Sequence, residues 1–119
     1  MIVTEGGKNI YPEDIETVFD GLPVKEYAIF AANYVWPQKE LGDREALMLV
    51  LRLEQNQAVN GQLLEDISAR NRELPDLKRV SGYLVWDRDF PRTASMKIKR
   101  QLLAVEIAKF FERAAIVNL

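Results

Sequence analysis

The sequence predicts an α+β domain with a small, mainly three-stranded sheet, packed helices and an N-terminal β-hairpin. Two observations lead to this fold class. Three segments have the β-branched, aromatic and aliphatic composition of strands, at 24–36, 45–54 and 80–86. Other segments repeat apolar residues at the three- and four-residue spacing of a helix. This order predicts helices layered on one sheet, and 119 residues are expected to form a single domain.

The N-terminal residues predict a tight hairpin followed by a helix. Residues 2–4 and 8–10 flank Gly6 and Gly7, and glycine takes the positive φ of a tight turn at little cost. Pro12 then pre-sets φ for the first turn of a helix. The expected apolar stripe of this helix consists of Ile15, Val18, Phe19 and Leu22.

The three long apolar segments are the expected strands of the main sheet. Residues 45–54 form a nearly continuous apolar run, which is typical of a central strand covered on both faces. Residues 24–36 and 80–86 are the other two strands. Residues 37–44 are polar and have the length of an ordinary connecting loop.

Two further helices are predicted after the second strand. Residues 61–74 have apolar residues at helical spacing, and Asn60 directly before them is a plausible N-cap. A last helix follows the third strand. Its apolar stripe is predicted at Ile98, Leu102 and Val105.

Composition excludes several classes of function. A net charge of −2 and a pI near 5.2 give no reason to expect binding to nucleic acid or to an anionic membrane. The chain has no cysteine and no histidine, so it lacks disulfides, thiolate metal ligands and the usual general base, and no metal site is expected. The longest apolar run, at 46–51, is too short for a transmembrane segment. The first residues lack the pattern of a signal peptide, and the expected location is the cytoplasm.

A cationic segment near the C-terminus is the main candidate site. Five cations fall within thirteen residues, at Arg88, Arg92, Lys97, Lys99 and Arg100. Such a cluster suits an anionic ligand, phosphate above all. Lys97 lies at the expected start of a helix, where the helix dipole disfavours a cation. By residue type alone, a solvated lysine and a ligand-binding lysine both stay open.

Two segments together resemble a known family. The first is Gly-Gly-Lys-Asn-Ile-Tyr-Pro-Glu-Asp-Ile-Glu at 6–16, and the second is Pro-Arg-Thr-Ala-Ser-Met-Lys-Ile-Lys-Arg at 91–100. In this order and separation they closely resemble the C-terminal domain of the adenylate-forming superfamily. That superfamily includes acyl- and aryl-CoA synthetases, luciferases and the adenylation domains of nonribosomal peptide synthetases. The resemblance covers Ile2 to about Ala108.

The resemblance implies roles for individual residues. Lys97 matches the catalytic lysine that contacts the substrate carboxylate and the α-phosphate region of ATP during adenylation. Gly6 and Gly7 match the loop that lines the pantetheine tunnel of coenzyme A in the second half-reaction. Lys8, Lys99 and Arg100 are candidate phosphate contacts, with a solvated lysine as the alternative for Lys8.

One position departs from the family pattern. The family usually has glycine directly before the lysine, and this chain has Met96. Methionine does not replace a glycine held at positive φ without strain, so the local backbone is expected to differ here. Long-chain fatty acyl-CoA synthetases often have an apolar residue at this position, which points to that branch.

The implied function is that of the mobile C-terminal domain of an ATP-dependent carboxylate–CoA ligase, with a fatty acid as the expected carboxylate. The large N-terminal domain that binds ATP, Mg²⁺ and the acyl group is absent from this chain, so the chain alone is expected to fold without catalysing. Two alternatives stay open. One is an amino-acid-activating adenylation domain that serves a carrier protein, and the other is a non-catalytic α+β module that binds a phosphorylated partner.

Overall fold

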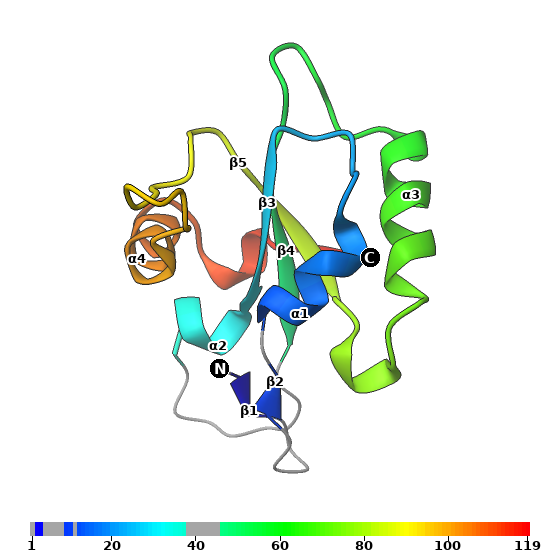
Figure 1. Cartoon of the computed structure of the whole chain (residues 1–119), viewed down its shortest axis with the longest axis horizontal. Helices are drawn as coiled ribbons and strands as arrows, with labels where there is room; N and C mark the ends of the chain where they lie inside the picture. Colours follow the sequence, from blue (N-terminus) through cyan, green and yellow to red (C-terminus); the bar gives the residue numbers. More distant parts are fainter. Residues whose placement is uncertain (1, 4–8, 11, 38–45) are drawn as a thin grey trace.

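The computed structural model describes residues 2–3, 9–10, 12–37 and 46–119. Two sheets lie in this part of the chain, a small one of β1 and β2 and a larger one with the order β3-β4-β5-β6 (Figure 1). In the larger sheet β3 and β4 are antiparallel, β4 and β5 parallel, and β5 and β6 antiparallel. The strands are β1 (Ile2–Val3), β2 (Asn9–Ile10), β3 (Glu26–Ala31), β4 (Leu47–Arg52), β5 (Gly82–Trp86) and β6 (Val117–Asn118).

Three long strands form most of the larger sheet, which confirms the predicted fold class. Strand β4 is central and buried along nearly its whole length, as its continuous apolar sequence predicted. The short fourth strand, β6, was not predicted. The strand predicted over 24–36 is too long, because the chain turns into α2 (Ala32–Val35) after Ala31. This turn buries Val35 in the apolar cluster on one face of the sheet and packs Trp36 against that cluster. An extended strand would instead have continued past the end of its partner β4.

The remaining helices include the three predicted ones, in the predicted order, together with short 3₁₀ helices. They are α1 (Pro12–Glu16), η1 (Thr17–Phe19), α3 (Gly61–Asn71), η2 (Asp76–Lys78), α4 (Arg100–Phe110) and η3 (Arg113–Ala115). Asn60 caps α3 as predicted, because its side-chain oxygen accepts a hydrogen bond of 2.9 Å from the Leu63 amide. Among the described helices, none has both the length and the apolar character needed to cross a membrane.

The larger sheet has helices on both faces, and alternate residues of each strand supply the two cores. Helices α1 and α3 cover one face, and α4 with α2 covers the other; Figure 1 shows α3 and α4 on opposite sides of the strands. The first face buries Ile29, Ala31, Leu47, Leu49 and Leu51. The second face buries Ala28, Phe30, Met48, Val50, Leu84 and Trp86.

The predicted apolar stripe of α4 is wrong. Leu102 and Val105 are 46% and 48% exposed, whereas Leu103 and Ile107, one turn apart, are fully buried against the sheet. Ile98 is partly buried at the edge of the same cluster. Apolar residues occur on both sides of this helix, so their spacing could not show which side faces the sheet.

Candidate functional site

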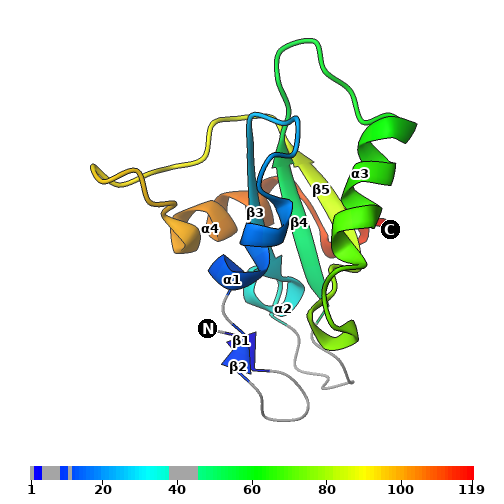
Figure 2. The same cartoon turned by 45° about the vertical axis from the view of Figure 1, so that its right-hand side comes forward.

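The candidate catalytic lysine lies on a hairpin formed by residues 91–99, called the Lys97 hairpin below. The Lys99 amide donates to the Pro91 carbonyl and the Thr93 amide donates to the Lys97 carbonyl, each at 2.8 Å. The Met96 amide donates to the Thr93 carbonyl at 2.9 Å and closes the turn. Figure 2 shows that this segment, just before α4, projects away from the sheet.

Met96 has a left-handed backbone, with φ of 68°. The hydrogen bonds around it are those of a three-residue hairpin loop, in which a tight turn is followed by one left-handed residue. Met96 therefore adopts the positive φ that was expected of glycine and not of methionine. The side chain is 67% exposed, so it gains little packing in return for the strained conformation.

The backbone at Met96 and Lys97 is held at three polar atoms. The Lys97 amide donates to Thr93 Oγ1 at 3.2 Å, and its carbonyl accepts from the Thr93 amide. The carbonyl of the preceding residue, Met96, accepts from Arg92 Nη1 at 2.7 Å. The Lys97 side chain itself is exposed, and within the described residues its ammonium group forms no ion pair. The hairpin thus presents an exposed cation on a backbone held by hydrogen bonds.

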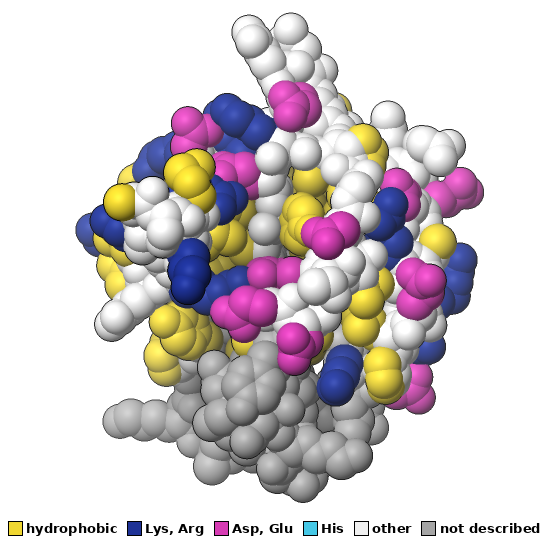
Figure 3. Space-filling model, viewed as in Figure 1, with side chains coloured by type: hydrophobic (Ala, Val, Ile, Leu, Met, Phe, Trp, Pro, Cys, Tyr) yellow, Lys and Arg dark blue, Asp and Glu magenta, His cyan; other side chains and the backbone are white. Residues whose placement is uncertain are grey.

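The five predicted cations do not act as one cluster. Arg92 pairs with Glu26 and Arg100 pairs with Glu16, so both guanidinium groups have carboxylate partners. Basic side chains lie around α4 and the loop before it in Figure 3, beside acidic side chains over α1. Only part of the positive charge is therefore available to an added anion.

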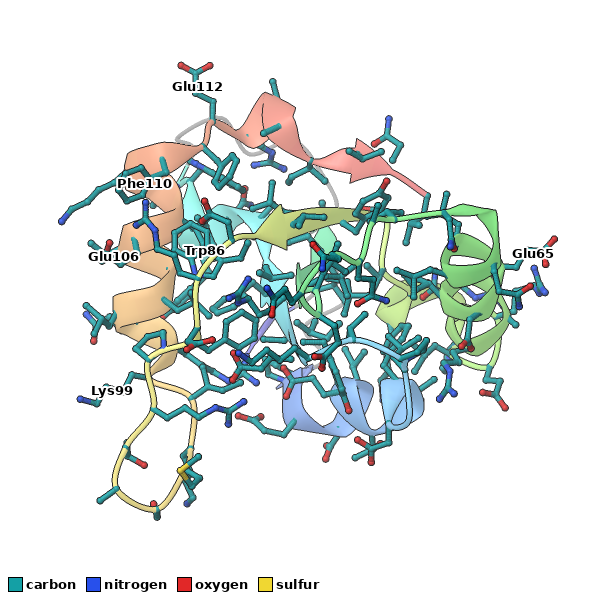
Figure 4. The ribbon with its side chains drawn as sticks, turned by 90° about the horizontal axis from the view of Figure 1, so that it is seen from above. Glu65, Trp86, Lys99, Glu106, Phe110 and Glu112 are labelled. Atoms are coloured by element: carbon teal, nitrogen blue, oxygen red, sulfur yellow. The ribbon has the colours of Figure 1, made fainter. Side chains whose placement is uncertain are left out.

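Arg88 and Lys99 have different surroundings. The Arg88 guanidinium lies 4.0 Å from the ring centroid of Phe110 and 5.3 Å from that of Trp86. Figure 4 shows Trp86 beside Phe110 on α4, and Lys99 near the base of the hairpin with its side chain directed away from the sheet. Lys99 is exposed, and its role as a phosphate contact stays a prediction.

Arg100 connects the start of α4 to the edge strand β3 and to α1. Its Nη1 donates to the Ile29 carbonyl at 2.8 Å, and its Nη2 donates to both carboxylate oxygens of Glu16, at 2.5 and 2.6 Å. The Ile29 amide in turn donates to Glu16 Oε2 at 2.7 Å. The two side chains thus satisfy the edge of β3 at Ile29, where no strand from the described part of the chain pairs with it. A phosphate contact from Arg100 stays a prediction, and the phosphate would compete with Glu16 for the guanidinium.

Gly6, Gly7 and Lys8 lie outside the described residues. The two strands that flank them pair as predicted, with Ile2 opposite Ile10 and Val3 opposite Asn9. The roles of the two glycines in the coenzyme A tunnel and of Lys8 at a phosphate therefore stay predictions. Within the described residues, no cluster of three acidic side chains could hold a metal ion.

The sequence gives no sign of the Glu26–Arg92 pair or of the Glu16–Arg100 pair. Glu26 lies in a strand segment without a motif, and 66 residues separate it from Arg92. Glu16 belongs to the first motif, but its partner Arg100 is 84 residues away. No local pattern in one sequence joins residues so far apart.

Comparisons with known proteins give a consistent set of relatives, although no family model matches the chain. The medium/long-chain-fatty-acid–[acyl-carrier-protein] ligase FadD10 of Mycobacterium tuberculosis is 34% identical over 101 residues, which cover 83% of this chain and 18% of that protein. A solved fatty acyl CoA synthetase of M. tuberculosis is 27% identical, with a TM-score of 0.62, and the match covers 92% of this chain and 20% of that one.

A further solved structure shares the fold. The ATP-bound chimera RpMatB-BxBclM B1 has a TM-score of 0.66 at 23% identity, over 94% of this chain and 21% of the chimera. The chain therefore spans about a fifth of the length of the proteins it matches. In each case nearly the whole chain takes part in the match.

Proposed function

Since the chain belongs to the C-terminal domains of the adenylate-forming, AMP-forming ligases, we propose that it is the mobile C-terminal domain of an ATP-dependent carboxylate–CoA ligase. A fatty acid is the proposed carboxylate. One observation carries the proposal: the Lys97 hairpin projects from the sheet and presents an exposed lysine on a backbone fixed by Thr93 and Arg92. The ATP and acyl pockets belong to a larger domain outside these residues.

In the first half-reaction, a carboxylate oxygen attacks the α-phosphorus of ATP, acyl-adenylate forms and pyrophosphate leaves. Negative charge builds up between the carboxylate and the α-phosphate. The Lys97 ammonium is a compact cation on a flexible stem, which suits it to stabilise this charge. The described residues offer no cluster for Mg²⁺, so a metal ion would be held by the larger domain.

In the second half-reaction, a thiol attacks the acyl carbonyl, the thioester forms and AMP leaves. We assign this step to a second orientation of the domain, in which the Gly6–Gly7 loop replaces the Lys97 hairpin at the site. Coenzyme A is the proposed thiol. A carrier-protein thiol is the second candidate, and the name of the relative at 34% identity supports it.

The first experiment tests Lys97 in each half-reaction. The chain is joined to the ATP- and acyl-binding domain of its own ligase, or to that of the M. tuberculosis fatty acyl CoA synthetase. Lys97→Ala should slow adenylation by roughly 10²–10³-fold, the scale of one preorganised electrostatic contact. Thioester formation from supplied acyl-adenylate should change little. Lys78→Ala, at an exposed lysine of η2, is the matched control and should leave both steps unchanged.

Two results would contradict this proposal. One is an equal loss in both half-reactions of Lys97→Ala, which would make the residue structural. The other is pyrophosphate release from ATP and a fatty acid by the 119-residue chain alone. Measuring thioester formation with coenzyme A and with an acyl carrier protein, side by side, distinguishes the two proposed acceptors.

The second experiment tests the glycine loop. Gly7→Leu adds a side chain where the pantetheine arm is proposed to pass, so thioester formation should stop while adenylation continues. Circular dichroism and thermal melting show whether the variant is folded. A folded Gly7→Leu protein with normal thioester formation would make Gly6 and Gly7 an ordinary turn.

A further inference from the structure

Glu26 and Arg92 form an anchored pair beneath the Lys97 hairpin. Glu26 is the first residue of β3, and its side chain is only 14% exposed. Its Oε1 accepts from Arg92 Nε at 2.9 Å and forms an ion pair of 2.9 Å with Arg92 Nη2, and its Oε2 accepts from the Phe90 amide at 3.0 Å. The carboxylate thus fixes the guanidinium to the rigid edge of the sheet.

The third nitrogen of this guanidinium reaches the turn of the hairpin. Arg92 Nη1 donates to the Met96 carbonyl at 2.7 Å. The Lys97 amide donates to Thr93 Oγ1, so the peptide group between Met96 and Lys97 is held at both of its polar atoms. This peptide group follows a left-handed methionine, a conformation that the residue does not prefer by itself.

These contacts form a continuous connection from the sheet to the lysine. It runs from Glu26 to Arg92, then to the Met96 carbonyl and the Lys97 backbone. If the Arg92 contact were lost, Met96 would be freer to relax to negative φ. That relaxation would redirect the Lys97 side chain, because the backbone dihedrals before a residue set the direction of its Cα–Cβ bond.

We propose that Arg92, anchored by Glu26, is the positioning residue that holds Lys97 in the orientation needed for adenylation. This inference rests on the proposed function of Lys97 and gives Arg92 a role that does not require contact with the substrate. Arg92 acts through the Met96 carbonyl, and its Nε, Nη1 and Nη2 atoms all have protein partners. Its positive charge is therefore paired within the domain, and Lys97 is the cation proposed to meet the substrate.

A double-mutant cycle tests the inference in the ligase that carries this domain. Arg92→Met removes the donors and keeps much of the side-chain length. It should lower the single-turnover rate constant of adenylation by about 10- to 100-fold, within the range measured for misplaced catalytic groups. In a Lys97→Ala background, Arg92→Met should lower it by less than about twofold, because the group it positions is gone.

Three further measurements separate positioning from other roles. The KM for ATP should stay nearly constant in Arg92→Met, whereas a direct phosphate contact would raise it. Thioester formation from supplied acyl-adenylate should also stay constant. Arg79→Met is the matched control, because Arg79 also pairs with a carboxylate, that of Asp76, and donates to backbone carbonyls. Arg79 directly follows η2, and its substitution should leave adenylation unchanged.

The outcomes distinguish this inference from the function on which it rests. If Lys97→Ala leaves adenylation intact, the proposed function fails. If Lys97→Ala lowers adenylation but Arg92→Met lowers it further by the same factor in both backgrounds, the positioning role alone fails. If thermal melting shows that Arg92→Met does not fold, Glu26→Gln replaces it in the same cycle and decides in the same way.

Discussion

Glu16 and Arg100 lie 84 residues apart in sequence and form an ion pair of 2.5 Å that joins α1 to the start of α4. Both side chains also bind the backbone of Ile29, on the edge strand between them. The segment after the Gly6–Gly7 loop and the segment after the Lys97 hairpin are thus fastened to the same strand. In the proposed function, α1 and the start of α4 would move together when the domain turns.

We expect Glu16→Gln to lower the free energy of unfolding by about 1–3 kcal/mol. The two side chains are only 15% and 22% exposed. The change leaves the partly buried Arg100 with only the longer pair of 3.4 Å to the exposed Glu13. Urea unfolding followed by circular dichroism measures the effect. The control is Glu106→Gln, which removes the more exposed Glu106–Lys109 pair and should cost less than about 0.5 kcal/mol. Similar losses of stability in both variants would show that the Glu16–Arg100 pair stabilises the fold no more than the exposed pair does.

The left-handed Met96 makes the hairpin sensitive to side-chain branching. Met96→Val should lower stability by about 1–2 kcal/mol, because a β-branched residue fits φ of 68° poorly. Met96→Gly should change stability by less than about 1 kcal/mol, since relief of strain is offset by a more flexible unfolded chain. Ala94→Val controls for a branched residue in the same loop. If Met96→Val is as stable as the parent in thermal melts, the left-handed conformation is not required.

Gly82 leaves room for the last strand of the sheet. A Cβ at this position would lie 2.5 Å from Ile116 Cγ2 and 2.7 Å from the Val117 carbonyl oxygen, so β6 would have to move. We expect Gly82→Ala to destabilise the domain and to increase amide hydrogen exchange at 117–119. Gly61→Ala is the matched change, because nothing lies within 4 Å of its Cβ and alanine favours the helix. It should stabilise by about 0.5–1 kcal/mol, and equal effects at both sites would contradict the steric argument.

Tyr27 should make the free energy of unfolding depend on pH in the alkaline range. Burial, together with the hydrogen bond that its hydroxyl donates to Asp20, raises the pKa of the Tyr27 phenol well above its ordinary value of 10. The folded protein keeps this proton while the unfolded chain releases it. The free energy of unfolding should therefore fall as the pH rises above 10.

Tyr27→Phe isolates this effect. The stability advantage of the parent over the variant should be constant below pH 10 and should shrink above it. Tyr34→Phe, at an exposed tyrosine, is the matched control for the loss of one hydroxyl. An advantage of the parent that stays constant or grows above pH 10 would contradict the raised pKa.

Local patterns in the sequence account for much of the fold. The continuous apolar run of β4, the Asn60 cap of α3 and the pairing of β1 with β2 were predicted because each depends on neighbouring residues. The predictions failed where the local sequence was compatible with two different structures. Apolar residues on both sides of α4 left its buried face undecided, and the strand-like composition after Ala31 hid the short helix α2.

The candidate site was likewise predictable only in part from the sequence. Lys97 and its place before a helix are visible in the sequence, and the family resemblance depends on residues close together in the chain. The partners of Arg92 and Arg100 are not visible there, because ion pairs between residues 66 and 84 positions apart form only when the strands and helices have packed.

The sequence by itself thus determined the order of the strands and helices, the candidate lysine and the family pattern around it. Those features follow from side-chain type and spacing along a short stretch of chain. Only the tertiary structure decided which face of α4 is buried and that Met96 is left-handed. It also decided that two of the five cations, Arg92 and Arg100, form ion pairs with Glu26 and Glu16. Such properties depend on which groups meet in space once the apolar faces are buried, and the packing of the sheet brings Glu26 to Arg92 and Glu16 to Arg100.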